Sequence, residues 1–256
     1  ATVQLQGAET ITGLTQDINS GTWSYVGDAD AVADTYTIKD FGATDYFNLQ
    51  INSADGTIEV HQLASPLSVA GTLDVVAGTF DANGQTATST GLTTVSGGEY
   101  KAGTATQTLN GGLTVSGGTF TGSTGTVDVV AVTISTGTLT APSGSFLVSG
   151  NWSKTGGAFT PGANTVTFDN TVARTLRSGG SAFNDISHTG AGSLTLNTDA
   201  LAVDGTMSNS AGTFSANLLA VTVTGLTTVS AGTYLASTAT QTFNGGLTVS
   251  GGIFTG

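Results

Sequence analysis

The chain has 256 residues, of which 9% are charged, and 17 Asp and Glu against five Lys and Arg give it a formal net charge of −12 at pH 7. This balance argues against nucleic-acid binding, because that requires a basic surface to displace counterions from phosphates. Membrane insertion is not expected, since no run approaches the roughly 18 apolar residues that span a bilayer. The lack of cysteine excludes disulfides and thiolate metal sites.

The first predicted element is a short strand at residues 1–6, where apolar and polar side chains alternate. Lys, Glu and Arg, which favour helices, are scarce throughout, whereas Thr and the 38 Gly are frequent. We therefore expect almost no helix in the chain. Val, Ile, Leu and Phe are plentiful and regularly spaced, which argues against a disordered low-complexity segment.

Residues 15–45 interrupt the pattern and concentrate aromatic and acidic side chains. Segments that protrude from a repeat fold often carry binding surfaces. The aromatic side chains could contact glycans by stacking on sugar rings, but the favoured interpretation is that they pack a local core. These residues are Trp23, Tyr25 and Tyr36.

The same segment holds three acids, Asp28, Asp30 and Asp34, in an Asp-x-Asp-x-x-x-Asp spacing. Such a set could offer oxygen ligands to Ca²⁺. The Gly and Glu positions of an EF-hand are missing, however, as are the nonapeptide repeats of calcium-binding β-rolls. A solvated acidic loop is the favoured interpretation, calcium is the alternative, and no other cofactor is predicted.

From residue 71 onward, a small-residue turn followed by one bulky apolar residue recurs about every 20 residues. A spacing this regular is typical of a solenoid, in which one coil cannot bury its apolar face without a neighbour. The bulky residues are Phe80, Tyr100, Phe120, Leu139 and Phe159, and then Phe214, Tyr234 and Phe254.

One coil, residues 113–131, divides into three short strands and three turns. This grammar predicts an all-β, single-stranded parallel β-helix (β-solenoid) with about 20 residues and three short strands per coil. The bulky residues would form an inward ladder with the flanking threonines, such as Thr79, pointing outward. A second ladder is expected through Val95, Val115, Ile134 and Val148. An antiparallel sandwich or barrel is the alternative, but hairpin folds do not normally repeat a three-strand unit.

A longer repeat is superimposed on the first, because residues 71–122 match residues 205–256 without a gap. Each position of the first segment, from Gly71 onward, has its counterpart in the second, from Gly205 onward. A block of several coils has therefore been duplicated. We expect one continuous β-solenoid over residues 1–256, with an irregular insertion at 15–45.

Several short sequence segments resemble those of a known protein family. They are Leu113-Thr-Val-Ser-Gly-Gly118, Gly117-Gly-Thr-Phe-Thr121, Asn151-Trp152-Ser153, Asn164-Thr-Val-Thr-Phe168 and Tyr36-Thr-Ile-Lys-Asp40. The chain resembles the very large β-strand repeat surface proteins of environmental bacteria, which are similar in grammar to autotransporter and filamentous-haemagglutinin β-helices. The resemblance implies an extracellular, cell-surface location and a structural or adhesive role. It supplies no catalytic motif.

Two functions follow as expectations. The first is a fibre, stalk or filament at the cell surface, because residues 1–6 and 252–256 look like uncapped strands that could stack head to tail on another copy or on neighbouring repeats of a longer chain. The alternative is an adhesin or glycan-binding passenger that uses the 15–45 insertion. An enzyme is not expected, because His61, His188, Arg174 and Arg177 have no phased carboxylate partner.

Overall fold

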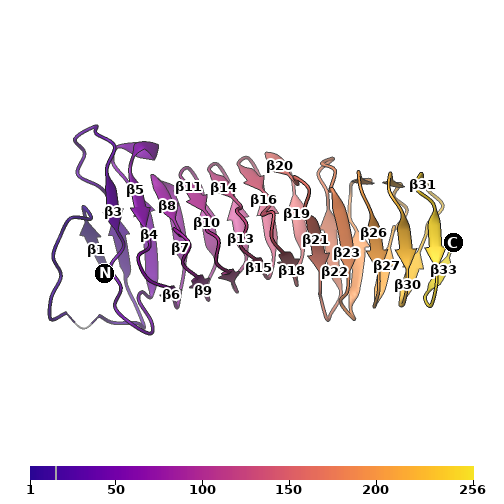
Figure 1. Cartoon of the computed structure of the whole chain (residues 1–256), viewed down its shortest axis with the longest axis horizontal. Helices are drawn as coiled ribbons and strands as arrows, with labels where there is room; N and C mark the ends of the chain where they lie inside the picture. The colour runs from indigo at the N-terminus through magenta and orange to yellow at the C-terminus, as the bar shows by residue number, and fades with distance from the viewer. Residues whose placement is uncertain (15) are drawn as a thin grey trace.

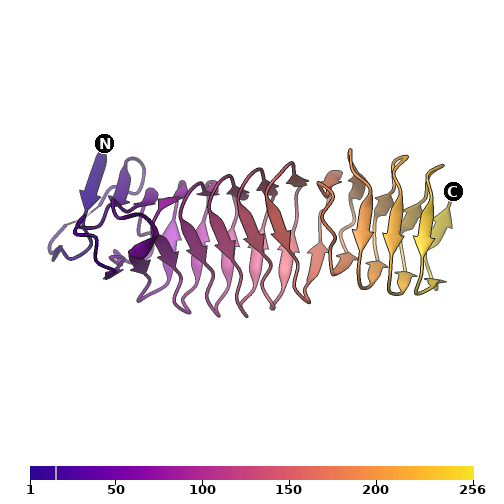
Figure 2. The same ribbon diagram turned by 90° about the horizontal axis from the view of Figure 1, so that it is seen from above.

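The computed structural model is a rod-shaped β-solenoid with its two termini at opposite ends (Figure 1). It describes residues 1–14 and 16–256, so the first residue of the predicted insertion, Thr15, lies outside the described residues. The strands pair in parallel from one coil to the next, about 13 turns of about 20 residues each, which confirms the predicted β-helix. Within the described residues the one helical element is a 3-10 turn, η1 (Gly56–Ile58). Figure 2 shows the coils following one another along the rod.

The solenoid has three faces, and face 1 is a single sheet of 13 strands that runs from the first strand of the chain to the last. Its order is β1 (Thr2–Leu5), β2 (Thr22–Tyr25), β4 (Asn48–Asn52), β7 (Leu73–Ala77), β10 (Thr93–Val95), β13 (Leu113–Val115), β16 (Val132–Ile134), β19 (Trp152–Lys154), β22 (Arg174–Arg177), β24 (Ser193–Leu196), β27 (Thr213–Ser215), β30 (Thr233–Leu235) and β33 (Ile253–Thr255).

Face 2 is divided into two sheets, with an isolated bridge between Phe183 and Val203 in the second part. The first sheet holds β3 (Thr35–Thr37), β5 (Val60–Gln62), β8 (Thr79–Asp81), β11 (Glu99–Lys101), β14 (Thr119–Thr121), β17 (Thr138–Thr140) and β20 (Ala158–Thr160). The second sheet, which takes the same place between faces 1 and 3, holds β25 (Leu201–Val203), β28 (Val221–Val223) and β31 (Gln241–Phe243).

Face 3 is a sheet of ten strands. It holds β6 (Leu67–Val69), β9 (Ala87–Ser89), β12 (Gln107–Leu109), β15 (Val127–Val129), β18 (Phe146–Val148), β21 (Thr165–Phe168), β23 (Asp185–His188), β26 (Met207–Asn209), β29 (Thr227–Val229) and β32 (Leu247–Val249).

The duplicated block does not return to the same faces. Strand β13 (Leu113–Val115) lies on face 1, but its counterpart β32 (Leu247–Val249) lies on face 3. Likewise β14 lies on face 2, and its counterpart β33 lies on face 1. The offset between the two copies is not a whole number of coils, because it exceeds six coils by two strands of the three. The second copy is therefore turned by one face around the solenoid axis.

The predicted inward ladder is confirmed for the first block, where Phe80, Tyr100 and Phe120 pair in register on face 2 and their rings lie 4.7 and 5.0 Å apart. It begins earlier than expected, because Tyr36 pairs with His61 and His61 pairs with Phe80. The later residues Phe214, Tyr234 and Phe254 form a separate ladder on face 1, as the turned second copy requires.

One detail of the predicted ladders is wrong. Val148 does not continue the row through Val115 and Ile134: it pairs with Val129 on face 3, and Lys154 follows Ile134. The reason is that Val148, in β18, follows Ile134, in β16, by two strands and not by a full coil of three. Thr79 is buried, although it precedes the inward Phe80 in β8 and the alternation of side chains along a strand therefore turns it to the opposite side.

Stacked glycine turns explain the spacing of the repeat. A Cβ atom on Gly118 would overlap the carbonyl oxygen of Gly98, and one on Gly98 would overlap that of Gly78. Adjacent coils are separated only by the distance between hydrogen-bonded strands, about 4.8 Å. A turn whose backbone lies directly on the backbone of the next turn leaves no room for a side chain, which explains the glycines at this place in the coils of the first block.

Candidate functional site

Three of the aromatic side chains of the 15–45 segment, those singled out from the sequence, are buried at the N-terminal end of the rod. Trp23 is 8% exposed, Tyr25 1% and Tyr36 9%. Trp23 packs against Phe41 with ring centroids 5.1 Å apart, and Tyr36 stacks on the His61 ring at 5.4 Å. These contacts agree with the local-core interpretation. They do not support the predicted glycan contact, which needed exposed ring faces.

The same aromatic side chains help to cover the N-terminal coils, where the sequence suggested no cap. Tyr25 and Tyr46 share a hydrogen bond between their hydroxyl groups at 3.0 Å. The backbone of Lys39 closes the cluster: its N–H donates to the Tyr25 hydroxyl at 2.8 Å, and its carbonyl accepts from the Tyr46 hydroxyl at 2.6 Å. Burial raises the pKa of Tyr25. Residues 38–47 are thus tied to the solenoid as a cap, because β2 turns Trp23 and Tyr25 inward.

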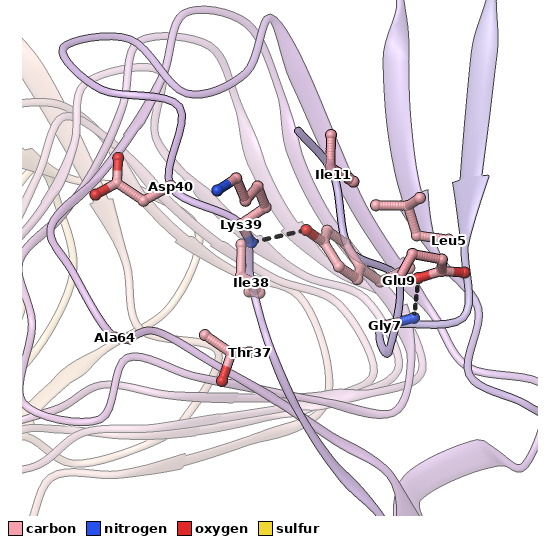
Figure 3. A pocket seen from close by; sticks show the side chains of 10 residues that line it. Leu5, Gly7, Glu9, Ile11, Thr37, Ile38, Lys39, Asp40 and Ala64 are labelled. Atoms are coloured by element: carbon pink, nitrogen blue, oxygen red, sulfur yellow. Dashed lines mark hydrogen bonds between the residues drawn. The ribbon is translucent and has the colours of Figure 1, made fainter. Parts of the chain in front are cut away.

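A hollow of about 360 Å³ lies beside this cap, between residues 5–11 and 37–40 (Figure 3). Its charged wall comes from Glu9, Lys39 and Asp40. Partial burial opposes ionisation of Glu9, but the N–H groups of Gln6 and Gly7 donate to its carboxylate at 2.7 and 2.8 Å and hold its pKa below the ordinary value. The hydrogen bonds of Glu9 are thus made within its own N-terminal loop. The hollow is an open depression beside the cap.

The structure brings Asp28, Asp30 and Asp34 together in the loop between β2 and β3, each offering a carboxylate oxygen within 4.8 Å of the others. Asp28 also belongs to a second group, with Asp55 and Glu59 of the following coil, that meets the same distance limit. Sequence analysis missed Asp55 and Glu59. No periodic signal could align them with Asp28, because the insertion lengthens the chain between the two coils.

Glu59 is the unusual member of the second group because it is fully buried. Its Oε1 accepts a hydrogen bond from Asp28 N at 3.2 Å, whereas its Oε2 has no hydrogen-bond partner among the side chains that the structure describes. Burial raises the pKa of Glu59; hydrogen bonding by the Ser53 side chain and the Asp28 N–H opposes this in part, and the nearby carboxylates of Asp55 and Asp28 add to it.

The nearest base to Glu59 is His61, whose Nε2 lies 4.0 Å from Glu59 Oε2 and 2.9 Å from Ser53 Oγ. Burial lowers the pKa of His61 to about 4. The imidazole is therefore neutral at neutral pH and brings no positive charge to the carboxylate.

The remaining side chains that were weighed for catalysis tie neighbouring coils together. Arg177 Nε lies 3.0 Å from Asp199 Oδ2, and Arg174 Nε donates to the carbonyl oxygen of Ser149 at 3.3 Å. His188 is fully buried on face 3, with its Nδ1 2.7 Å from Asn209 Oδ1.

The environment of His188 predicts a pH dependence of stability. Burial lowers the pKa of His188 below 6.5, and its hydrogen bond with Asn209 opposes this only in part. The unfolded chain then binds the proton at a higher pH than the folded chain. The free energy of unfolding should therefore be independent of His188 above about pH 6.5 and should fall as the pH drops below that value. We expect His188→Gln, which cannot titrate, to reduce this slope by up to about 1.4 kcal/mol per pH unit.

Urea unfolding of both proteins between about pH 7.5 and pH 5 measures the difference. Buried carboxyl groups such as Asp45 titrate equally in both proteins, so they cancel in the comparison. Identical slopes for the two proteins would contradict the prediction.

The C-terminal coil has an open face formed by β31, β32 and β33. Leu247 is 38% exposed, Val249 45% and Ile253 60%. In the first copy of the block, the counterparts of the first two, Leu113 and Val115, are 1% and 0% exposed. The difference arises because β16 covers Leu113 and Val115. The same apolar sequence is therefore buried in one copy and open to solvent in the other.

Comparison with known proteins gives no relative from which a function could be transferred. In the described part of the chain, the structure contains no helix long and apolar enough to cross a bilayer. No protein-family model, no curated protein and no solved structure matches this chain.

Proposed function

We propose that this protein is a structural segment of an extracellular fibre or stalk at the cell surface, and that it extends by end-to-end stacking of solenoid coils. The observation that carries the proposal is the open apolar face of the C-terminal coil. Exposed strand edges with apolar side chains are sites where further strands add. The location outside the cell rests on the acidic, Lys-poor composition and on the resemblance to bacterial surface repeats.

The first copy of the block indicates what should cover this face. Over Leu113 and Val115 lies β16, a strand whose inward residues Val132 and Ile134 pair with them in register. A covering coil should therefore present a parallel strand with apolar side chains two residues apart. Another copy of this chain has an apolar strand at its N-terminal edge, β1, which carries Val3 and Leu5. Because β1 belongs to face 1, it would cover β33 with its residue Phe254, and the coil that β1 begins would cover β32 on face 3.

The two ends of the rod differ, and this sets the geometry of the contact. At the N-terminal end, face 1 projects beyond faces 2 and 3 through β1 and β2, and Val3 is 42% exposed. At the C-terminal end, β33 is the last strand of the same sheet. We therefore propose head-to-tail stacking in which β33 of one copy pairs with β1 of the next, so that face 1 continues through the fibre. Such an assembly is heterologous and does not close.

Self-association of the 256-residue chain tests the proposal. We expect analytical ultracentrifugation to show concentration-dependent oligomers, and electron microscopy to show fibres with an axial repeat of about 60 Å, from 13 strands at about 4.8 Å each. The double substitution Leu247→Lys and Val249→Lys should abolish assembly, because it places charges on core positions that are open at the C-terminal end. Val3→Lys should weaken it from the other end.

Val172→Lys is the matched control, because Val172 is as exposed as these residues but lies on a lateral turn far from both ends. It should assemble as the unaltered chain does. A wild-type chain that stays monomeric at all concentrations, or an assembly unaffected by the double substitution, would overturn head-to-tail stacking.

A further inference from the structure

The buried carboxylate of Glu59 lies at the point where the acidic loop of one coil meets the next coil. The loop after β2 supplies Asp28, while Asp55 and Glu59 stand on either side of η1. One oxygen of each carboxylate lies within 4.8 Å of the others. Two ligands on opposite sides of a calcium ion are separated by about the same distance, since calcium–oxygen bonds measure about 2.3–2.6 Å.

If the buried carboxylate of Glu59 is ionised, the neighbouring side chains do not supply the positive charge that would balance it. Its Oε2 has no hydrogen-bond partner, and no Lys or Arg of residues 1–14 and 16–256 forms an ion pair with Glu59, Asp28 or Asp55. A buried ionised carboxylate normally requires a paired charge or a metal ion. Either Glu59 holds a proton, or a cation occupies the space between the three carboxylates.

The loop geometry holds this carboxylate in place while leaving oxygens free. Gly27 lies so close to Glu59 that a Cβ atom at this position would overlap the carboxylate. The N–H of Asp28 donates to Glu59 Oε1 at 3.2 Å, and the N–H of Ala31 donates to Asp55 Oδ2 at 3.1 Å. The loop backbone thus occupies one oxygen on each of these two acids. Within the described part of the chain, the second oxygen of Glu59 has no hydrogen-bond partner.

We propose that Asp28, Asp55 and Glu59 bind a calcium ion that clamps the loop of residues 26–34 to the coil around η1. Three carboxylates give hard oxygen ligands, and Asp28 and Asp55 reach the surface, where water completes the six to eight ligands of Ca²⁺. The irregular arrangement suits Ca²⁺ better than Mg²⁺, which demands near-ideal octahedral geometry.

The group predicted from sequence, Asp28, Asp30 and Asp34, differs from this site in one decisive way. It contains no buried member without a partner, and Asp30 Oδ1 already accepts a hydrogen bond from Val32 N at 2.8 Å. Asp30 and Asp34 add negative charge near the bound ion but are not needed as its ligands.

Calcium binding to the full chain after EDTA treatment tests the proposal. Equilibrium dialysis with CaCl₂ alone should show one saturable site, and thermal unfolding should show a higher Tm in CaCl₂ than in MgCl₂ or NaCl of equal ionic strength. Glu59→Gln should lower the calcium affinity by at least about tenfold, because loss of a direct ligand should cost no less than loss of an outer contact. Asp55→Asn, at a partly exposed position, should do the same if Glu59→Gln fails to fold.

Asp204→Asn is the matched control, because it removes one exposed carboxylate of the same charge far along the rod. It should leave calcium affinity unchanged, and Asp30→Asn should change it less than Asp55→Asn does. Absence of saturable binding would mean that Glu59 is protonated, and the proposal would fail. Equal effects of Asp204→Asn and Asp55→Asn would show charge screening of the acidic chain and would also overturn it. Both measurements are possible on a monomer, so they do not depend on fibre formation.

Discussion

Replacing Trp152 with alanine should lower the free energy of unfolding by about 3–5 kcal/mol, the usual cost of deleting a buried tryptophan side chain. Trp152 is fully buried in β19. Its ring lies 4.8 Å from the Phe159 ring and 5.1 Å from the Phe183 ring. These aromatic side chains fill the junction between the two copies of the block, where face 2 is interrupted between β20 and β25. On face 2, side-chain packing replaces strand pairing across that interruption, whereas faces 1 and 3 remain paired.

The position of Trp152 should also change the form of the unfolding transition. In a repeat fold, each coil is stabilised mainly by its neighbours, so weakening one internal interface divides the chain into two cooperative units. We expect the unaltered chain to unfold in one transition in guanidinium chloride and Trp152→Ala to unfold in two. Circular dichroism and tyrosine fluorescence would follow them.

Trp23→Ala is the matched control, since it deletes the same side chain at one end of the rod. Trp23 contacts Phe41 and Tyr46 in the N-terminal cap. Its loss should loosen the terminal coils while the rest unfolds as before, with a smaller loss of stability. The junction would have no special role if Trp152→Ala cost no more than Trp23→Ala, or if it left a single transition.

The regular coils could be predicted because the sequence states their physical requirements directly. A turn such as Gly117-Gly118 must lack side chains where backbones stack, and one bulky residue such as Phe120 must fill the core of each coil. The change of face between the two copies of the block was not predicted, although their offset is not a whole number of coils. The sequence does not indicate how the coils between the two copies are arranged. The segment around Phe183 shows neither the alternating pattern of a strand nor the residues typical of a turn.

The N-terminal end could not be predicted in the same way. Trp23 and Tyr25 are two residues apart in a strand, so their side chains lie on the same side of it. The sequence alone does not show whether that side faces the core. The pairing of Trp23 with Leu49 in β4 decides it. His61 joins the ladder although it is polar, and Glu59 meets Asp28 only because the insertion folds back over the next coil.

Replacing Gln107 with leucine should destabilise the protein by about 3 kcal/mol or more, although the change makes the side chain more apolar. Gln107 is fully buried on face 3. Its Oε1 accepts a hydrogen bond from the Tyr100 hydroxyl at 2.7 Å, and its Nε2 donates to the carbonyl oxygens of Gln85 and Ala105, both at 3.0 Å. Leucine would leave these three groups without partners, and each buried unsatisfied group costs about 1–3 kcal/mol.

The duplicated block provides the control for this prediction within the same molecule. Gln241 makes the same contact with Tyr234, at 2.7 Å, but in the open C-terminal coil, where it is only partly buried. Water can satisfy the groups that Gln241→Leu would release, so this variant should lose much less stability than Gln107→Leu. The double variant Tyr100→Phe with Gln107→Leu should lose less than the sum of the single variants, because removing the hydroxyl removes one unsatisfied group. Equal losses at positions 107 and 241 in urea unfolding, or additive losses at 100 and 107, would show that the internal hydrogen-bond network does not contribute to stability in this way.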